Sequence, residues 1–105
     1  MTRRRSERIL LQIRVVVETT TEEGKWVRLE AFTLVVNAHG GLLEMSLKVG
    51  KGHKMLLMNP VLGAQQSCRV VGLRGSVDGQ FAVAFEFDGP APQFWPIPFP
   101  PSDWI

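Results

Sequence analysis

The sequence predicts an all-β domain: a small six-stranded antiparallel β-barrel with an extended C-terminal tail rich in proline and aromatic residues. Short apolar runs rich in β-branched residues recur along residues 9–88 and alternate with polar, glycine-containing turns. No stretch shows the apolar period of about 3.6 residues that is typical of a helix. Short antiparallel strands at this spacing leave the fewest exposed edges when they close into a barrel.

The first two predicted strands form a hairpin. Residues 9–18 (ILLQIRVVVE) are rich in β-branched side chains and predict the first strand. The polar segment TTTEEGKW, residues 19–26, has the composition of a hairpin connection. Apolar and charged residues alternate from Val27 to Ala31, which is the period of a strand with one solvent-facing side. We therefore expect residues 25–36 to pair with the first strand.

The later strands are shorter and separated by glycine and proline. They are a strand around Leu43 and Met45, then residues 53–58, 67–75 and 80–87. Asp78 and Gly79, between the last two, are a strong hairpin signal. In the last strand the alternate positions from Phe81 to Phe87 are apolar and share one face, so we expect that face in the core.

The tail, GPAPQFWPIPFPPSDWI, has a different character. Its prolines exclude a regular helix or a central strand. Its apolar side chains are too many for a free linker: Phe94, Trp95, Ile97, Phe99 and Trp104. We expect them to pin the tail against one end of the barrel. The alternative is that Trp95, Phe99 and Trp104 form an exposed apolar patch that contacts a partner or a second copy.

The chain has 105 residues, enough for one domain with a hydrophobic core. We divide it into a basic arm (residues 1–8), the barrel (residues 9–88) and the tail (residues 89–105). The net charge is only +2, because 12 Lys and Arg residues face 10 Asp and Glu residues. The clustering of arginine in the arm is therefore more informative than the net charge.

Residues for metal or catalytic chemistry are scarce. Cys68 is the only cysteine, which excludes an internal disulfide and fits a reducing compartment. Together with His39 and His53 it cannot complete a tetrahedral zinc site, so we expect no metal or cofactor. We expect Cys68 to be a small core residue and His53 to be solvated. No nucleophile with a base, and no convergent carboxylates, can be recognised, so we do not expect an enzyme.

The chain shows no sign of a membrane segment. No apolar run approaches the roughly eighteen residues that span a bilayer, and no signal peptide opens the sequence. We therefore expect a cytoplasmic protein without membrane insertion.

Two segments contain candidate ligand-binding residues. The arm, RRRSER, offers Arg4, Arg5 and Arg8, whose planar donors can grip phosphate or the O6/N7 edge of guanine and can stack on a base. In NAHGG, residues 37–41, Asn37 can donate and accept at a base edge, and the glycines let a ligand approach the backbone. The alternatives are a solvated basic tail, and a simple turn in which Asn37 bonds its own backbone and His39 is exposed.

The two segments together resemble the PilZ domain, the bacterial receptor module for cyclic di-GMP. That family has an Arg-x-x-x-Arg arm, two strands, an Asp/Asn-x-Ser-x-x-Gly motif and a closing strand of the VGVEF type. Here RRSER supplies Arg4 and Arg8, NAHGG supplies Asn37, and FAVAFEF resembles the closing strand. The resemblance implies that the arm folds over the ligand, and that its arginines contact the phosphates and the guanines.

The second motif departs from the family pattern at two positions. His39 stands where the family has serine, and Leu42 stands at the final glycine unless a one-residue deletion brings Gly41 there. Both side chains are bulkier and narrow the site, although His39 can donate to a phosphate or stack on guanine. The complete candidate site is Arg4, Arg5, Arg8, Asn37, His39, Gly40 and Gly41.

These departures leave two functions open. The first is a cyclic di-GMP receptor that passes the signal to a partner protein. The second is a degenerate PilZ domain that does not bind the nucleotide and acts as a protein interaction module. A barrel that binds single-stranded nucleic acid is a third reading, but the strands lack an exposed aromatic pair with flanking basic residues, so we do not expect it.

Overall fold

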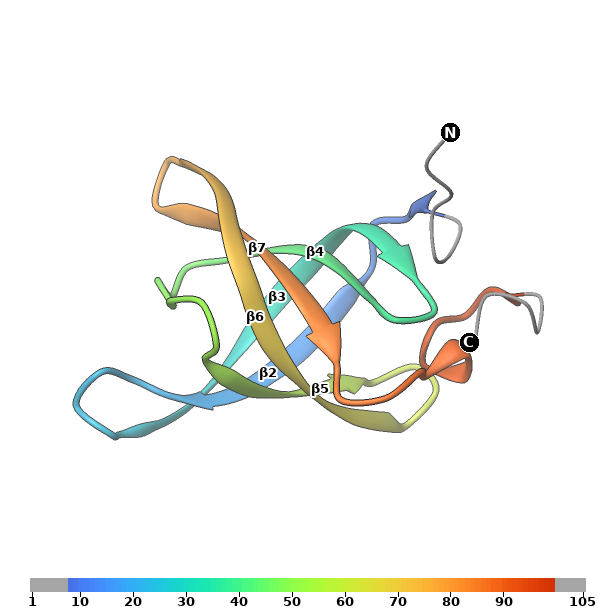
Figure 1. Ribbon diagram of the computed structural model, residues 1–105, viewed down its shortest axis with the longest axis horizontal. Helices are drawn as coiled ribbons and strands as arrows, with labels where there is room; N and C mark the ends of the chain where they lie inside the picture. The colour runs from blue at the N-terminus through green and yellow to red at the C-terminus, as the bar shows by residue number, and fades with distance from the viewer. Residues whose placement is uncertain (1–7, 100–105) are drawn as a thin grey trace.

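The computed structural model describes residues 8–99, which form an antiparallel barrel with one additional strand (Figure 1). The elements are β1 (Ile9–Leu10), β2 (Arg14–Thr20), β3 (Trp26–Asn37), β4 (Gly40–Met45), β5 (Lys54–Asn59), β6 (Ala64–Val77), β7 (Gln80–Phe87) and the 3-10 turn η1 (Pro92–Phe94). Among the described residues η1 is the only helical element. The predicted all-β class is therefore confirmed.

The barrel consists of six strands in the order β3-β2-β5-β6-β7-β4, and β4 pairs with β3 to close it. Every neighbouring pair is antiparallel, and β1 adds to β3 as the seventh strand. The six-stranded antiparallel barrel expected from the sequence is therefore confirmed. Because β3 pairs with β1, β2 and β4, it is the strand on which closure depends.

The first predicted strand is not continuous, because residues 11–13 interrupt it between β1 and β2. These three residues face only two residues of β3, Thr33 and Leu34, so the β1–β2 segment bulges here. The buried hydroxyl of Thr33 spans the bulge: it accepts from the Ile13 N–H at 3.0 Å and donates to the Leu11 carbonyl at 2.6 Å. Sequence alternation alone did not reveal this break.

The predicted hairpin turns are present. Asp78 and Gly79 both have positive φ, 52° and 78°, the conformation that suits a two-residue connection between twisted strands. The β2–β3 connection closes through the Gly24 N–H, which donates to the Thr21 carbonyl at 2.9 Å. The Asn-Pro turn joins β5 to β6 as expected.

The core contains the inward-facing residues of all six barrel strands. On β7, Val83, Phe85 and Phe87 are buried and share one face with the partly buried Phe81, as predicted. Cys68 on β6 is fully buried, which confirms it as a small core residue. His53 is not solvated as expected: it is half-buried, and its Nε2 donates to the Thr20 carbonyl at 2.8 Å.

The tail packs over one end of the barrel. Phe94, Trp95 and Phe99 are 3%, 2% and 4% exposed, and the Phe94 and Trp95 rings have centroids 5.2 Å and 5.8 Å from that of Phe87. This confirms that the tail covers a barrel end, although η1 gives it one helical turn instead of a wholly extended course. The alternative prediction, an exposed apolar patch, is wrong for Trp95 and Phe99, because both are buried. Trp104 lies outside the described residues.

Within residues 8–99, no helix is both long and apolar enough to cross a bilayer.

Replacing Trp95 by alanine is expected to lower the free energy of unfolding by about 3 to 5 kcal/mol, because the indole is buried and its removal opens the barrel end. Urea denaturation measures the change. Trp26→Ala is the matched control, since Trp26 is 69% exposed, and its effect should stay within about 0.5 kcal/mol. Equal losses in the two variants would contradict the covering role of Trp95.

Burial, together with the negative charge of Asp88, raises the pKa of the Cys68 thiol from an ordinary 9.0 to about 12. Because this pKa is higher in the folded than in the unfolded chain, the protonated thiol stabilises the fold fully below pH 9. That contribution is lost as the pH rises from 9 to 12. Between pH 8 and pH 10 the wild type should lose about 1.4 kcal/mol more unfolding free energy than Cys68→Ala. Parallel losses measured by urea denaturation of both proteins would refute the assignment.

Candidate functional site

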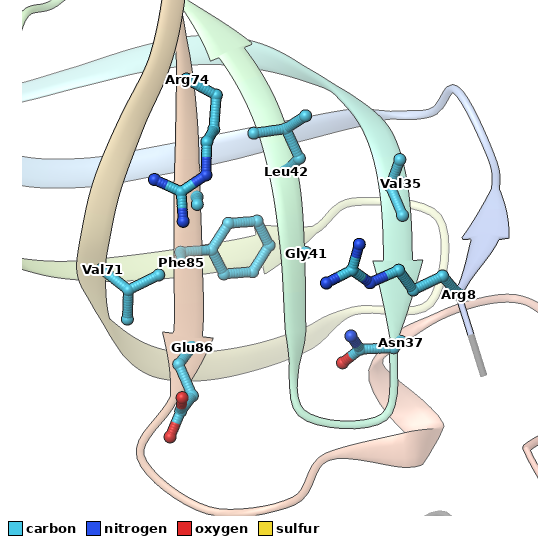
Figure 2. Close-up of a pocket in the computed structure, with 10 residues that line it drawn as sticks. Arg8, Val35, Asn37, Gly41, Leu42, Val71, Arg74, Phe85 and Glu86 are labelled. Atoms are coloured by element: carbon cyan, nitrogen blue, oxygen red, sulfur yellow. The ribbon is translucent and has the colours of Figure 1, made fainter. Parts of the chain in front are cut away.

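A pocket with a volume of about 500 Å³ lies on the barrel wall formed by β3, β4, β7 and β6 (Figure 2). Its lining residues are Arg8, Val35, Asn37, Gly41, Leu42, Val71, Arg74, Ala84, Phe85 and Glu86. The partly exposed Leu42, Ala84 and Glu86 alternate with buried neighbours along their strands, so the pocket opens on the outer face. Its volume is in the range of small-ligand sites, about 300 to 1,000 Å³.

The pairing of β1 with β3 brings the two sequence-predicted segments together. Ile9 lies opposite Val36, so the preceding residue, Arg8, comes to lie beside Asn37. Figure 2 shows the Arg8 guanidinium extending across the pocket next to the Asn37 amide. Arg4 and Arg5, the other predicted arginines, lie outside the described residues.

Asn37 is fixed by two hydrogen bonds. Its Oδ1 accepts from the His39 N–H at 2.8 Å, which is an Asx turn, and its carbonyl accepts from the Trp95 Nε1–H at 2.8 Å. The bond to its own backbone agrees with the simple-turn interpretation, whereas its place in the pocket wall agrees with the binding interpretation. The turn therefore positions this amide at the pocket.

His39 does not belong to the pocket lining. It forms a two-residue turn with Ala38, its carbonyl accepts from the Phe87 N–H at 2.7 Å, and its side chain is only 7% exposed. Its Nε2 is buried and has no hydrogen-bond partner among residues 8–99. The exposed histidine of the simple-turn interpretation is therefore wrong, whereas contact of His39 with a ligand stays a prediction.

Gly40 and Gly41 let the strands approach closely. A Cβ on Gly40 would collide with the Phe85 carbonyl, and a Cβ on Gly41 would collide with the Val35 carbonyl. Gly41 lines the pocket, and the Phe85 ring lies opposite it in the floor. Gly40 is not part of the lining, and its small size allows the close packing of β4 on β7.

The sequence motifs do not include the β6 side of the pocket. The register with β7 shifts between Val70 and Gly72 and again between Leu73 and Gly75. Val71 and Arg74 are thus the extra residues of two bulges, which turn side chains out of the regular alternation, and both line the pocket. The glycines within GLRG were the available signal, because a glycine inside a strand pattern often marks a bulge.

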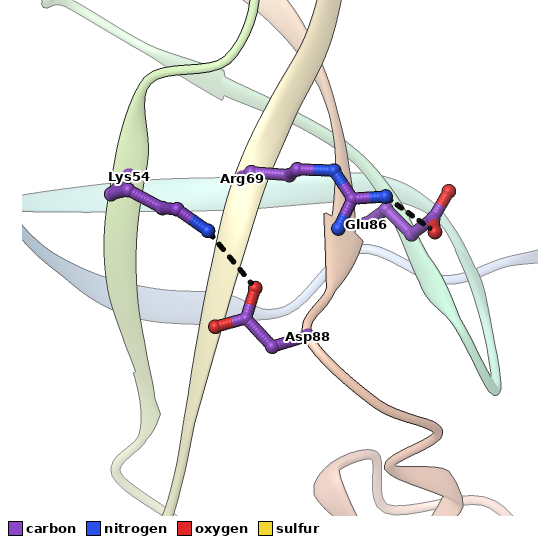
Figure 3. A network of polar contacts seen from close by, with 4 residues as sticks. All are labelled: Lys54, Arg69, Glu86 and Asp88. Atoms are coloured by element: carbon purple, nitrogen blue, oxygen red, sulfur yellow. Dashed lines mark hydrogen bonds and ion pairs between the residues drawn. The ribbon is translucent and has the colours of Figure 1, made fainter.

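The charge around the pocket is mainly positive. Arg8 and Arg74 make no ion pair with any acid among residues 8–99. Glu86, the acid in the lining, pairs with Arg69 at 3.0 Å, and Lys54 pairs with Asp88 at 3.6 Å just beyond it (Figure 3). Because Arg69 offsets the Glu86 charge, the pocket favours an anionic ligand.

No cluster of three or more potential metal-ligating side chains occurs in residues 8–99.

Comparison with known proteins leaves the family of this chain open: no family model matches the sequence, and no curated protein matches it. The fold and the site define a small antiparallel β-barrel with a basic pocket on its outer wall.

Gly40→Ala is expected to destabilise the fold by about 1 to 3 kcal/mol, because the added Cβ meets backbone of β7 that has no room to move. Gly50→Ala is the control, since Gly50 is exposed and has open space at its Cβ. Its stability should change by less than about 1 kcal/mol. A wild-type unfolding midpoint for Gly40→Ala in urea would show that the close approach is not required.

Proposed function

We propose that this protein is a cytoplasmic cyclic di-GMP receptor module of the PilZ type that passes ligand binding to a partner protein and catalyses no reaction. The observation that carries the proposal is the meeting of Arg8 and Asn37 at one pocket. These residues belong to the two separate segments that carry the PilZ resemblance, and the pairing of the additional strand β1 with β3 brings them side by side.

The chemistry of the pocket suits this ligand. Cyclic di-GMP carries two phosphates and two guanines, and an arginine fork can bond either a phosphate or the O6/N7 edge of guanine. Arg8 extends across the pocket over Gly41, so its guanidinium can bond to a ligand at the barrel wall or stack on a base. Arg4 enters the proposal through the spacing of the arm motif alone, and Arg5 enters it only as an additional cation of the arm.

A second candidate is a degenerate PilZ domain that acts only as a protein interaction module. The observation that favours it is Leu42, which lines the pocket near the position where the family pattern has glycine. His39 is also turned away, so no hydroxyl replaces the serine of the motif. In this case a smaller residue at position 42 would reopen the site.

Isothermal titration with cyclic di-GMP at low and moderate salt tests the receptor function. We expect saturable binding by the wild type and a loss of about tenfold to a hundredfold in Arg8→Ala, because a charge-assisted hydrogen bond contributes about 1.5 to 3 kcal/mol. Arg28→Ala is the matched control, since Arg28 is an exposed arginine of β3 outside the pocket lining.

The titration also separates the two candidates. GMP, which has one phosphate, should bind more weakly than cyclic di-GMP if the receptor function is right. No heat and no thermal shift with excess cyclic di-GMP would reject the receptor. Binding that appears only in Leu42→Ala would instead establish the degenerate module.

A further inference from the structure

Arg74 lies on the opposite side of the pocket from Arg8. It is the extra residue of the second β6 bulge, and Figure 2 shows its guanidinium directed toward the pocket above Phe85. Side chains alternate between the two faces of a strand. Without the bulge, Arg74 would therefore lie on the opposite face of β6. The bulge in the β6 backbone therefore sets the face of the strand from which the Arg74 side chain projects.

Gly72 makes room for this arrangement. A Cβ on Gly72 would lie 2.5 Å from Arg74 Nη1, so the guanidinium occupies the space that any other residue would fill. The three atoms nearest to that Cβ all belong to the Arg74 guanidinium. The absence of a side chain at Gly72 therefore leaves the space that the Arg74 guanidinium occupies.

The charges around Arg74 leave it available to a ligand. Among residues 8–99 it pairs with no carboxylate, and its one contact, with the Leu73 carbonyl at 3.5 Å, is too long for a strong hydrogen bond. Glu86, the acid of the lining, is held by Arg69. A cation kept apart from the acids on this face is suited to an external anion.

We propose that Arg74 is a ligand-binding residue of this pocket and that, with Arg8, it selects a ligand carrying two anionic groups. The inference rests on the proposed receptor function, and it names the residue on β6 that takes the second phosphate or the adjacent guanine edge. Each arginine approaches from its own side of the floor formed by Gly41. A ligand with a single phosphate engages one of them, whereas a cyclic dinucleotide engages both.

The test is isothermal titration of cyclic di-GMP into the wild type and five variants, one of which is Arg8→Ala. Arg74→Ala removes the cation, Arg74→Lys keeps the charge but loses the planar fork, and Gly72→Ala keeps the arginine but displaces it. Arg28→Ala again controls for net charge. Thermal unfolding of each variant verifies its fold, which should persist because Arg74 is exposed and Gly72 has no positive φ.

We expect Arg74→Ala to weaken binding by about tenfold to a hundredfold and Arg74→Lys and Gly72→Ala to weaken it measurably, whereas Arg28→Ala binds as the wild type does. GMP affinity should fall less than cyclic di-GMP affinity in Arg74→Ala. Wild-type affinity in Arg74→Ala, with a loss in Arg8→Ala, would overturn the role of Arg74 and leave the receptor function standing. Wild-type affinity in Gly72→Ala would overturn the positioning by glycine. No binding by the wild type would reject the receptor function and this inference with it.

Discussion

The structure depends on the pairing of β3 with three other strands. Within the barrel β3 pairs with β2 and β4. Beyond the start of β2, β3 pairs with β1 instead. The change from β1 to β2 occurs at a bulge, and the buried Thr33 hydroxyl supplies hydrogen bonds that regular pairing would have made there. Without these hydrogen bonds the pairing of β1 with β3 would be weakened, and Arg8 would not be held beside Asn37.

Asn37, the last residue of β3, links the pocket to the tail. Its side chain closes the Asx turn and lines the pocket, while its carbonyl accepts from the Trp95 indole. The Ala91 N–H also donates to the Ala38 carbonyl, so the tail is bonded to the turn at two places. A ligand that moves Asn37 would therefore also move the carbonyl that accepts the Trp95 hydrogen bond. These hydrogen bonds connect the pocket wall to the tail end of the barrel.

The fold could be predicted largely from the sequence because its signals are local. Strand alternation, the Asp-Gly turn and the apolar face from Phe81 to Phe87 are all properties of short segments. The site could be predicted only in part. Arg8, Asn37 and Gly41 were found through their motifs, but the face on which Arg74 lies depends on register shifts between strands. The turn after β3 is bonded to tail residues more than fifty positions away. Neither relation can be predicted from the pattern of residues within one short segment.

The location of the pocket follows from the way the barrel is filled. Leu43, Val83 and Phe87 occupy the interior, and Phe94 and Trp95 cover one end, so a ligand as large as a nucleotide has no room inside. The outer surface of the barrel remains as a place for a ligand. A ligand bound there needs contacts from side chains that project from the strands. Here Gly41 lies in the wall between the two arginines, with Arg8 on one side and Arg74 on the other. Recognition on such a surface depends on the direction of a few long side chains. The register of β1 on β3 and the bulges of β6 set that direction.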